Sequence, residues 1–536
     1  MRARRAAAAG PPRMRKSGSI PQRTRQMTMH NGGMHSAHSL RSADSGSLEA
    51  WFAPFRAGVI GHDMTDPRVQ GDGRVVYADW TASGRLYRPI EDYLVDVLGP
   101  YVANTHTEST LTGTQMTRAY HEAQAIIKKH CNAGPNDVLI AQGSGMTGVV
   151  NKFQRILGLR IPEQIADRVA IRDEEKPLVV LTHMEHHSNQ TSWEECAVHV
   201  EILPRAACGR PDVDKLHAIL ERNAHRPLKI GAFSACSNVT GIVTPYHEMA
   251  AIMHAHGGVC FVDFAASAPY VEIDMHPADP AQKLDAVYFS PHKFLGGPGA
   301  SGVLLFDAAL YRLKVPDSPG GGTVTWTNPW GGHRFIDNIE AREDGGTPGF
   351  LQTIRAALAV RLKERMGVAN IEARERELRE LFLAELRRDP GIRLLESDQC
   401  ERLCIFSFYS MEKHHNLIVR LLNDRYGVQV RGGCSCAGTY GHILLNVDEE
   451  TSHRITCQID AGDLSNKPGW VRASLHPTMT DEEVVYVARA IVEVMQHYDA
   501  WKDDYAFDPA TGEFHLRKPV APGMSLCDFD PLPKGR

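Results

Sequence analysis

The stretch Val259-Cys260-Phe261-Val262-Asp263, taken with Ala286-Val287-Tyr288-Phe289-Ser290-Pro291-His292-Lys293 further along, decides the fold. Each segment opens with a short apolar run that is typical of a buried strand. The first run ends in Asp263, and the second leads through a polar turn to Lys293, thirty residues later. Because the carboxyl ends of parallel strands meet at one edge of a sheet, where α/β proteins bind ligands, we expect Asp263 and Lys293 to face the same site.

Similar apolar runs recur along the chain, at 138–141, 178–181, 230–234 and 302–306. Between them stand segments whose apolar residues are three or four positions apart, which is typical of helices. Strands that alternate with helices predict an α/β fold with a mostly parallel sheet. The stretch 316–332 is rich in proline and glycine, interrupts the alternation and is predicted to be a loop.

A second, smaller α/β domain is predicted beyond that loop. Its expected elements are helices at 348–388, 415–426 and 481–497 and strands at 402–409, 428–431 and 470–475. The resulting division is a disordered basic extension over 1–47, a large ligand-binding domain over 48–335, a small domain over 336–500 and an irregular tail over 501–536. The first segment of the large domain is expected to pack on the small domain.

The composition narrows the class of protein. Of the 536 residues, 43% are hydrophobic and 23% are charged, which is ordinary for a soluble globular protein. The net charge of −5 argues against a nucleic-acid-binding protein, which should be basic. No apolar run reaches the roughly 18 residues that a membrane span needs. The 11 cysteines are thinly spread, so we expect no disulfide scaffold and a reducing compartment such as the cytoplasm.

The first 43 residues differ from the rest of the chain. They contain nine arginines and lysines and no acidic residue, which appears first at Asp44. A segment of this composition is predicted to be disordered. It is also typical of an organelle transit peptide, which makes the mitochondrial or plastid matrix the alternative location. An extension without function is the remaining interpretation.

The pair Asp263 and Lys293 suits pyridoxal phosphate. A lysine amine forms a Schiff base with its aldehyde, and a carboxylate keeps its pyridine nitrogen protonated, so that the ring acts as an electron sink. Its phosphate needs an anchor, and Gly143-Ser144-Gly145 stands between a predicted strand and a predicted helix, whose N-terminal N–H groups favour an anion. An ordinary loop lysine and a plain tight turn are the alternatives.

Seven motifs, taken in order, resemble the class V aminotransferase-fold enzymes, which depend on pyridoxal phosphate, and most closely the cysteine desulfurase and selenocysteine lyase group. The motifs are Tyr77-Ala78-Asp79-Trp80-Thr81-Ala82-Ser83-Gly84, Gly143-Ser144-Gly145, Glu185-His186-His187-Ser188-Asn189, Ser237-Asn238-Val239-Thr240-Gly241, Asp263-Phe264-Ala265-Ala266, Ser290-Pro291-His292-Lys293 and Arg431-Gly432-Gly433-Cys434-Ser435-Cys436. The resemblance covers about residues 48–497. It implies fold type I, with a mostly parallel seven-stranded sheet between helices in the large domain, and a homodimer with shared sites.

The resemblance also implies roles for individual residues. Lys293 carries the cofactor, Asp263 pairs with the pyridinium, and His186 stacks on the ring and helps to move protons. Asn238 contacts the ring hydroxyl. Phosphate contacts are expected from Ser144, Gly145, Ser290 and His292, and from Thr323 across the dimer interface. Arg472 is expected to bind the substrate carboxylate, with Arg431 as a second candidate. No metal site is expected.

Cys436 stands where the desulfurases have their nucleophilic cysteine. Its glycine-rich loop is suited to carrying a thiolate to the cofactor and away again, and Arg431 nearby is expected to lower the pKa of the thiol. Cys434 lies two residues earlier, and in an extended segment the two side chains would face the same way. Such a pair can also bind metal or form a disulfide, although four-ligand zinc spacing is missing.

Two departures from the family pattern stand out. Many desulfurases have a glutamine three residues after the pyridinium aspartate, where this chain has Ala266. The polar segment 438–461 is longer than expected after the cysteine and is predicted to be an insertion near the mouth of the site.

The function implied by the resemblance is that of a cysteine desulfurase, which removes sulfur or selenium from L-cysteine or L-selenocysteine through a cysteine persulfide and releases alanine. A sulfur-acceptor protein is then an expected partner. The alternatives are an aminotransferase, an epimerase or a C–S or C–N lyase that acts on another amino acid. A degenerate assembly or sulfur-carrier subunit is the non-enzymatic alternative, and it is disfavoured because Lys293 and Asp263 are both present.

Overall fold

The computed structural model describes residues 46–396, 401–518 and 523–532. Residues from Ser47 onward form one compact unit. The predicted disorder of the N-terminal extension, and its alternative as a transit peptide, lie outside the described residues. The division at 335/336 and 500/501 stays a proposal. Within the described parts of the chain, no helix is both long and apolar enough to cross a membrane.

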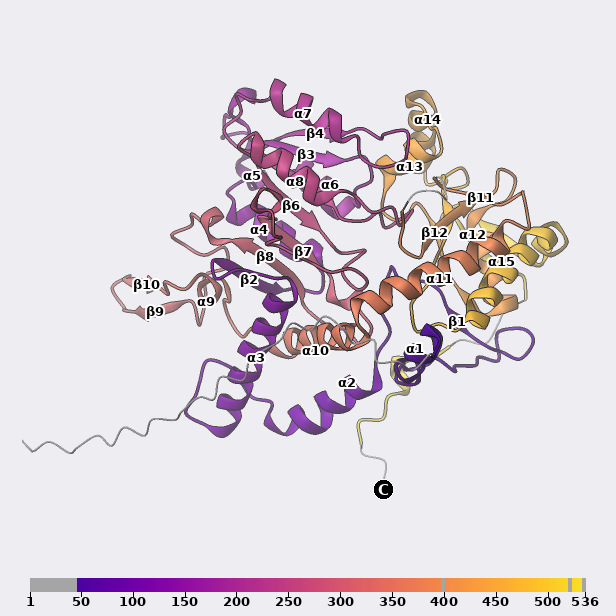
Figure 1. Cartoon of the computed structure of the whole chain (residues 1–536), viewed down its shortest axis with the longest axis horizontal. Helices are drawn as coiled ribbons and strands as arrows, with labels where there is room; N and C mark the ends of the chain where they lie inside the picture. The colour runs from indigo at the N-terminus through magenta and orange to yellow at the C-terminus, as the bar shows by residue number, and fades with distance from the viewer. Residues whose placement is uncertain (1–45, 397–400, 519–522, 533–536) are drawn as a thin grey trace, which may run out of the picture. The chain divides into compact units, whose positions relative to one another are not determined.

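A seven-stranded sheet forms the centre of the large domain (Figure 1). Its strands, in spatial order, are β2 (Asp137–Gln142), β8 (Gly302–Asp307), β7 (Ala286–Phe289), β6 (Val259–Asp263), β5 (Lys229–Ser234), β3 (Leu178–Thr182) and β4 (His199–Leu203). All neighbours run parallel except β8, which is antiparallel to both β2 and β7. The predicted α/β fold with a mostly parallel seven-stranded sheet is therefore confirmed. Only β4 was not predicted, because His199 and Glu201 interrupt its apolar pattern.

Helices cover both faces of this sheet, because side chains of each strand alternate between the faces. In β3, Leu178 and Val180 belong to one buried cluster, whereas Val179 and Leu181 belong to another. The first cluster includes residues of α3 (Leu111–His130), α7 (Val213–Arg222), α8 (Tyr246–Ala255) and α10 (Phe350–Met366). The second includes residues of α4 (Met146–Ile156) and α6 (His187–Glu194).

The small domain is built on a four-stranded sheet. Its order is β11 (Arg393–Leu394), β12 (Ile405–Tyr409), β15 (Trp470–Ser474) and β14 (Arg431–Gly433). Three helices pack with it, α11 (Val368–Leu386), α12 (His415–Tyr426) and α15 (Asp481–Trp501). The predicted helix over 348–388 is in fact two helices, α10 and α11, because the chain turns at Gly367 with φ of +82°.

The N-terminal helix α1 (Leu48–Ala57) packs against α11. The two-residue strand β1 (Val76–Tyr77) pairs with β13 (Val428–Gln429) of the small-domain segment. These contacts connect the chain before the central sheet to its C-terminal part. The remaining helices are short: α2 (Arg88–Asp92), α5 (Glu163–Ala166) and α9 (Ile339–Glu343).

Two hairpins replace predicted irregular segments. Within the predicted loop over 316–332 lies β9 (Val324–Thr327), which pairs with β10 (His333–Phe335) directly after the loop. In the predicted irregular tail, β16 (Tyr505–Asp508) pairs with β17 (Glu513–Leu516). Both predictions were wrong for these residues, because the flanking prolines and glycines masked short β-branched and aromatic alternations.

The predicted insertion over 438–461 is helical. It forms α13 (Gly438–Leu444) and α14 (Glu449–Asp460). Helix α13 begins two residues after Cys436, so the insertion starts directly beside the cysteine loop.

Candidate active site

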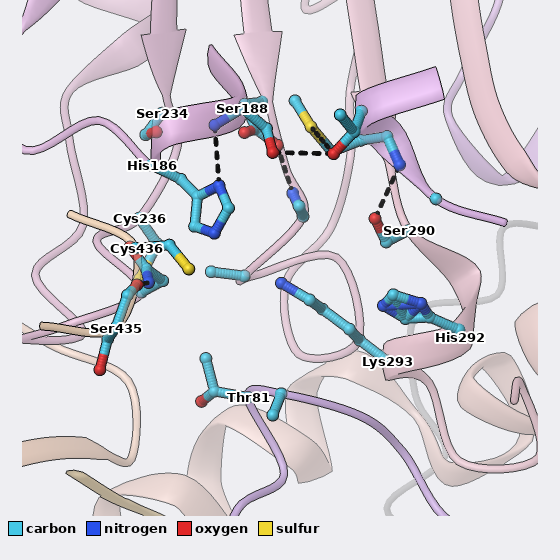
Figure 2. Close-up of a pocket in the computed structure, with 18 of the residues that line it drawn as sticks. Thr81, His186, Ser188, Ser234, Cys236, Ser290, His292, Lys293, Ser435 and Cys436 are labelled. Carbon is cyan, nitrogen blue, oxygen red and sulfur yellow. Dashed lines mark hydrogen bonds between the residues drawn. The ribbon is translucent and has the colours of Figure 1, made fainter. Parts of the chain in front are cut away.

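A cavity of about 480 Å³ opens where β6, β7 and the turn between β2 and α4 meet. Asp263 and Lys293 both line it, as their positions at two strand ends predict. Other predicted site residues that line it are Ser144, Gly145, His186, Asn238, Ser290, His292, Arg431, Cys436 and Arg472. Figure 2 shows His186 and Lys293 pointing into the same space from different elements.

Burial sets the protonation of Lys293 and Asp263. It lowers the pKa of Lys293 to about 8, opposed by Asp263 and assisted by Arg472. It raises the pKa of Asp263 to about 7, against a hydrogen bond that the carboxylate accepts from the N–H of Ala265 at 2.8 Å. The lysine therefore gives up its proton more readily than an exposed lysine, and Lys293 is the nearby cation that opposes protonation of the aspartate. Both features fit a ligand with an aldehyde and a basic ring nitrogen.

His186 precedes helix α6 and faces the cavity as a neutral ring. Burial, with the positive charge of Lys293, lowers the pKa of its imidazole to about 3. Its Nδ1 accepts a hydrogen bond from the N–H of Ser188 at 3.1 Å. In a neutral ring this leaves the proton on Nε2. The Nε2–H group is therefore the hydrogen-bond donor of this ring.

The turn before α4 fits a phosphate. Gly143 has φ of +62°, and a Cβ added at Gly145 would lie 3.2 Å from Ser290 Oγ, so the backbone approaches this corner closely. The Ser290 hydroxyl accepts from the N–H of Met146 at 2.9 Å. Within the described residues, the buried Nε2 of His292 has no hydrogen-bond partner. A helix start, two serines and an unpaired ring nitrogen form a donor set suited to an anion.

Asn238 has an acceptor available for a ligand. Its side-chain Nδ2 donates to the carbonyl of Ser435 at 2.7 Å. Its Oδ1 is buried and has no partner among the described residues. Ala266 lines the same cavity, so the position where many desulfurases have glutamine supplies no polar group.

The two predicted carboxylate-binding arginines share one carboxylate, Asp79. Arg472 is 3% exposed, and its Nη2 donates to Asp79 Oδ1 at 2.9 Å. Nε of Arg431 donates to Asp79 Oδ2 at 3.0 Å. The arginines are adjacent because β14 and β15 pair antiparallel with Arg431 opposite Arg472. Sequence reasoning placed Asp79 in a motif but assigned it no role; its position just after a strand was the available signal.

The two cysteines of the loop face different surroundings. Cys436 is exposed and lines the cavity, whereas Cys434 packs against a buried apolar cluster that includes Trp470. The prediction that the two face the same way was wrong, because the segment is not extended. Ser435 and Cys436 both have left-handed backbones, with φ of +51° and +55°.

Thr323 is the one predicted site residue that does not line the cavity. Its side chain is buried, and its hydroxyl donates to the carbonyl of Gly320 at 2.7 Å. Other lining residues were not predicted as site residues, among them Thr81, Thr147, Ser188 and Cys236. The hydroxyls of Thr147 and Ser188 share a hydrogen bond of 2.7 Å. A lone hydroxyl or thiol gives no sequence signal by itself.

Comparison with known proteins agrees with this architecture. The family model for aminotransferase class-V matches residues 76–487. A probable cysteine desulfurase of Halalkalibacterium halodurans is 28% identical over 387 residues, which cover 70% of this chain and 86% of that protein. A probable cysteine desulfurase of Staphylococcus aureus strain Mu50 is 27% identical over 378 residues, with the same coverage.

Solved structures share the fold. The cysteine desulfurase of Thermococcus onnurineus, in its apo form, matches with a TM-score of 0.65 at 21% identity and covers 83% of this chain and 98% of that one. The cysteine desulfurase CsdA of Escherichia coli matches with a TM-score of 0.64 at 22% identity and the same coverage. Since the family model spans more than half of the chain, the protein belongs to the aminotransferase class-V family, whose members are enzymes that depend on pyridoxal phosphate.

Proposed function

We propose that the protein is a cysteine desulfurase, which moves sulfur from L-cysteine, or selenium from L-selenocysteine, onto Cys436 and releases alanine. One observation carries the proposal: the exposed thiol of Cys436 lines the same cavity as Lys293 and Asp263. The relatives named as probable cysteine desulfurases support it. A cysteine beside the cofactor lysine has no role in simple amino-group transfer.

Several groups of this chain would hold the cofactor. Lys293 would attach it covalently, Asp263 would pair with its ring nitrogen, and His186 would pack on the ring. Its phosphate would be bound by Ser144, Gly145, Ser290 and His292, and Asn238 would contact the ring hydroxyl. When bound, pyridoxal phosphate supplies an electron sink for charge that develops on the substrate.

Arg472 binds the α-carboxylate of the substrate. A guanidinium can pair with a carboxylate through two hydrogen bonds, and burial strengthens both. Asp79 holds Arg472 through Nη2, and the main-chain carbonyl of Asn238 holds it through Nη1 at 3.0 Å. Arg431 reaches the same Asp79 carboxylate and adds positive charge at the entrance.

The remaining steps use Lys293, Cys436 and His186. Nζ of Lys293, whose pKa burial lowers to about 8, takes the proton from the substrate Cα. The thiolate of Cys436 attacks the substrate sulfur, so that an S–S bond forms while the C–S bond breaks. Lys293 returns its proton to Cα, and the proton lost by the Cys436 thiol goes to Cβ, with His186 helping to move it, which completes alanine. The sum is L-cysteine plus a thiol giving L-alanine plus a persulfide, so no outside oxidant or reductant is needed.

The experiment that tests the function is incubation of the purified, cofactor-loaded protein with a panel of amino acids. We expect alanine from L-cysteine, in step with sulfur on Cys436. Turnover of another amino acid without sulfur transfer would instead favour an aminotransferase, an epimerase or a C–S or C–N lyase.

Asp263→Asn is expected to retain the cofactor but to lose most activity. A neutral amide cannot keep the pyridine nitrogen protonated, which weakens the electron sink. Absorbance spectra and alanine release, measured on the same preparation, check this. Turnover close to wild type would remove Asp263 from the proposed site.

Asp79→Asn is expected to raise KM for L-cysteine more than it lowers kcat. The change weakens two charge-assisted hydrogen bonds, and a loss of roughly 1.4 kcal/mol in substrate binding corresponds to about a tenfold rise in KM. Steady-state kinetics check this, with Asp66→Asn as the matched control, because Asp66 pairs with Arg68 on the surface. Equal kinetics for the two variants would contradict the role of Asp79.

We further infer a homodimer in which the main chain at Thr323 completes the phosphate site of the other subunit, while the buried Thr323 hydroxyl holds that turn through the carbonyl of Gly320. Thr323 lies outside the cavity of its own chain, and exposed apolar side chains are available for a partner after α2, at Tyr93, Val95, Val97, Tyr101 and Val102. Thr323→Val is then expected to weaken cofactor binding severalfold while the dimer persists. Equilibrium titration with pyridoxal phosphate, together with light scattering, measures both; unchanged cofactor affinity would count against the shared site.

The proposal also includes a sulfur-acceptor protein and a cytoplasmic location. The thiols of Cys131, Cys236, Cys260, Cys404, Cys434 and Cys436 are free, which supports a reducing compartment.

A further inference from the structure

The loop that presents Cys436 has an unusual backbone. Two consecutive residues other than glycine, Ser435 and Cys436, have φ of +51° and +55°, and Gly433, two residues before Ser435, has φ of +98°. Side chains other than glycine rarely adopt this region, and such conformations persist only where surrounding contacts impose them. The contacts that impose them here come from outside the loop.

His187 contacts the loop on one side through two hydrogen bonds. Its main-chain N–H donates to the carbonyl of Cys436 at 2.8 Å. Its ring Nε2 accepts from the N–H of Gly438, also at 2.8 Å. The two bonds bracket the segment from Cys436 to Gly438, and His187 is the first residue of α6, a helix buried against the central sheet. The loop is thus attached to a rigid element of the other domain.

Asn238 and Trp470 contact the loop at Ser435. Nδ2 of Asn238 donates to the carbonyl of Ser435 at 2.7 Å, and Nε1 of Trp470 donates to the Ser435 hydroxyl at 3.2 Å. The main-chain carbonyl of Asn238 also accepts from Arg472 at 3.0 Å. Each of the two left-handed residues therefore has its carbonyl held by a donor from outside the loop.

We propose that His187 is a positioning residue that, together with Asn238, clamps residues 434–438 and directs the Cys436 thiol into the cavity. The proposal rests on the proposed sulfur transfer and refines it. Cys436 is presented in one fixed backbone conformation, rather than on a loop that carries it back and forth. The two neighbouring histidines therefore have different roles: His186 faces the cavity, and His187 contacts the cysteine loop.

The chemistry of the His187 ring suits this task. Only a neutral imidazole has an acceptor nitrogen, and the bond from Gly438 requires one. Burial lowers the pKa of His187, against the opposing charge of Glu194. The ring therefore keeps its acceptor at neutral pH.

Two substitutions of His187 distinguish loss of this hydrogen bond from a general loss of folding stability. A glutamine side chain can place an acceptor where Nε2 lies, whereas an asparagine side chain is one methylene too short. In the cofactor-loaded protein without substrate, His187→Asn is expected to speed hydrogen–deuterium exchange of the Gly438 amide by about tenfold, because its hydrogen bond is lost. His187→Gln is expected to restore most of the protection. His414→Asn is the matched control, since His414 lies immediately before a helix and its ring, like that of His187, accepts a main-chain N–H, here from Asn416 at 3.2 Å.

Equal exchange at Gly438 in wild type, His187→Asn and His187→Gln would overturn the proposal. If His187→Asn does not fold, Gly438→Ala tests the same bond from its other end, because a Cβ there would lie 3.1 Å from His187 Nε2 and force it back. We then expect faster alkylation of Cys436 by iodoacetamide and faster exchange over 434–438; no change in either would refute the clamp. Because these measurements need no substrate, a protein that holds the loop but releases no alanine would refute the desulfurase function and leave the clamp standing.

In variants that fold, the kinetics give a second readout. A positioning role predicts that His187→Asn lowers kcat for alanine release and leaves the equilibrium affinity for L-cysteine unchanged, since no contact to the substrate is removed. A fall in affinity with kcat unchanged would contradict that role.

Discussion

Lys293→Ala is expected to abolish covalent attachment of pyridoxal phosphate and to lower alanine formation by roughly 10²–10⁴-fold or more, the range attributed to a lost acid–base group. Lys293 is the one lysine among the described residues that line the cavity, so no neighbouring amine replaces it. The fold should persist, because the change removes a cation whose burial already lowers its pKa to about 8. Replacing it with a small apolar side chain relieves a desolvation cost.

The measurement is the near-visible absorbance of the purified variant before and after borohydride, with intact mass to detect a reduced adduct. Lys283→Ala is the matched control, since Lys283 is a half-buried lysine paired with Asp307 and Asp285 outside the cavity. A borohydride-fixed adduct that survives Lys293→Ala would show that another amine binds the cofactor.

The position of the site could be predicted from the sequence, because its signals are local. The apolar runs of β6 and β7 are continuous; the first ends in Asp263, and the second leads through a short polar turn to Lys293, and both residues line the cavity. Parallel topology then brings the two ends together without further information.

The substrate end of the site could not be predicted in the same way. Asp79 and Arg472 are 393 positions apart in the sequence and meet only through the packing of the N-terminal segment on the small domain. The pairing of Arg431 with Arg472 depends on the register of β14 and β15, and strand register across a long insertion has no local signature. The sequence motif that contains Asp79 could be recognised, but the pairing of Asp79 with the two arginines could not.

The conformation of the cysteine loop also could not be predicted from local sequence. Alternation of side chains predicts that Cys434 and Cys436 face the same way. The left-handed backbone at Ser435 and Cys436 separates them. It is imposed by donors from His187 and Asn238, which are distant in sequence.

Cys436→Ser is expected to leave the cofactor spectrum and substrate binding unchanged and to reduce alanine release by several orders of magnitude, as loss of a nucleophile does in other enzymes. A hydroxyl has nearly the same size as a thiol but does not attack a sulfur atom to form a persulfide. The exposed position of Cys436 makes a folding defect an unlikely explanation for the loss. Spectra recorded with L-cysteine, and alanine quantified by mass spectrometry, check both parts.

Cys434→Ser is the matched comparison and should have a milder effect. Cys434 packs against the apolar cluster around Trp470 and does not line the cavity, so its substitution costs some loop stability without removing the nucleophile. If Cys434→Ser abolishes alanine release while Cys436→Ser does not, the nucleophile has been assigned two residues too late.

The central claim is that sulfur passes from L-cysteine to Cys436, and peptide mass spectrometry with sulfur-labelled L-cysteine tests it most directly. Wild-type protein, quenched after one turnover, is predicted to carry one labelled sulfur atom on the peptide that contains Cys436, with one alanine released per sulfur bound. The same peptide from Lys293→Ala and from Cys436→Ser should carry none. Alanine release without label on Cys436, or label on another residue, would contradict the account.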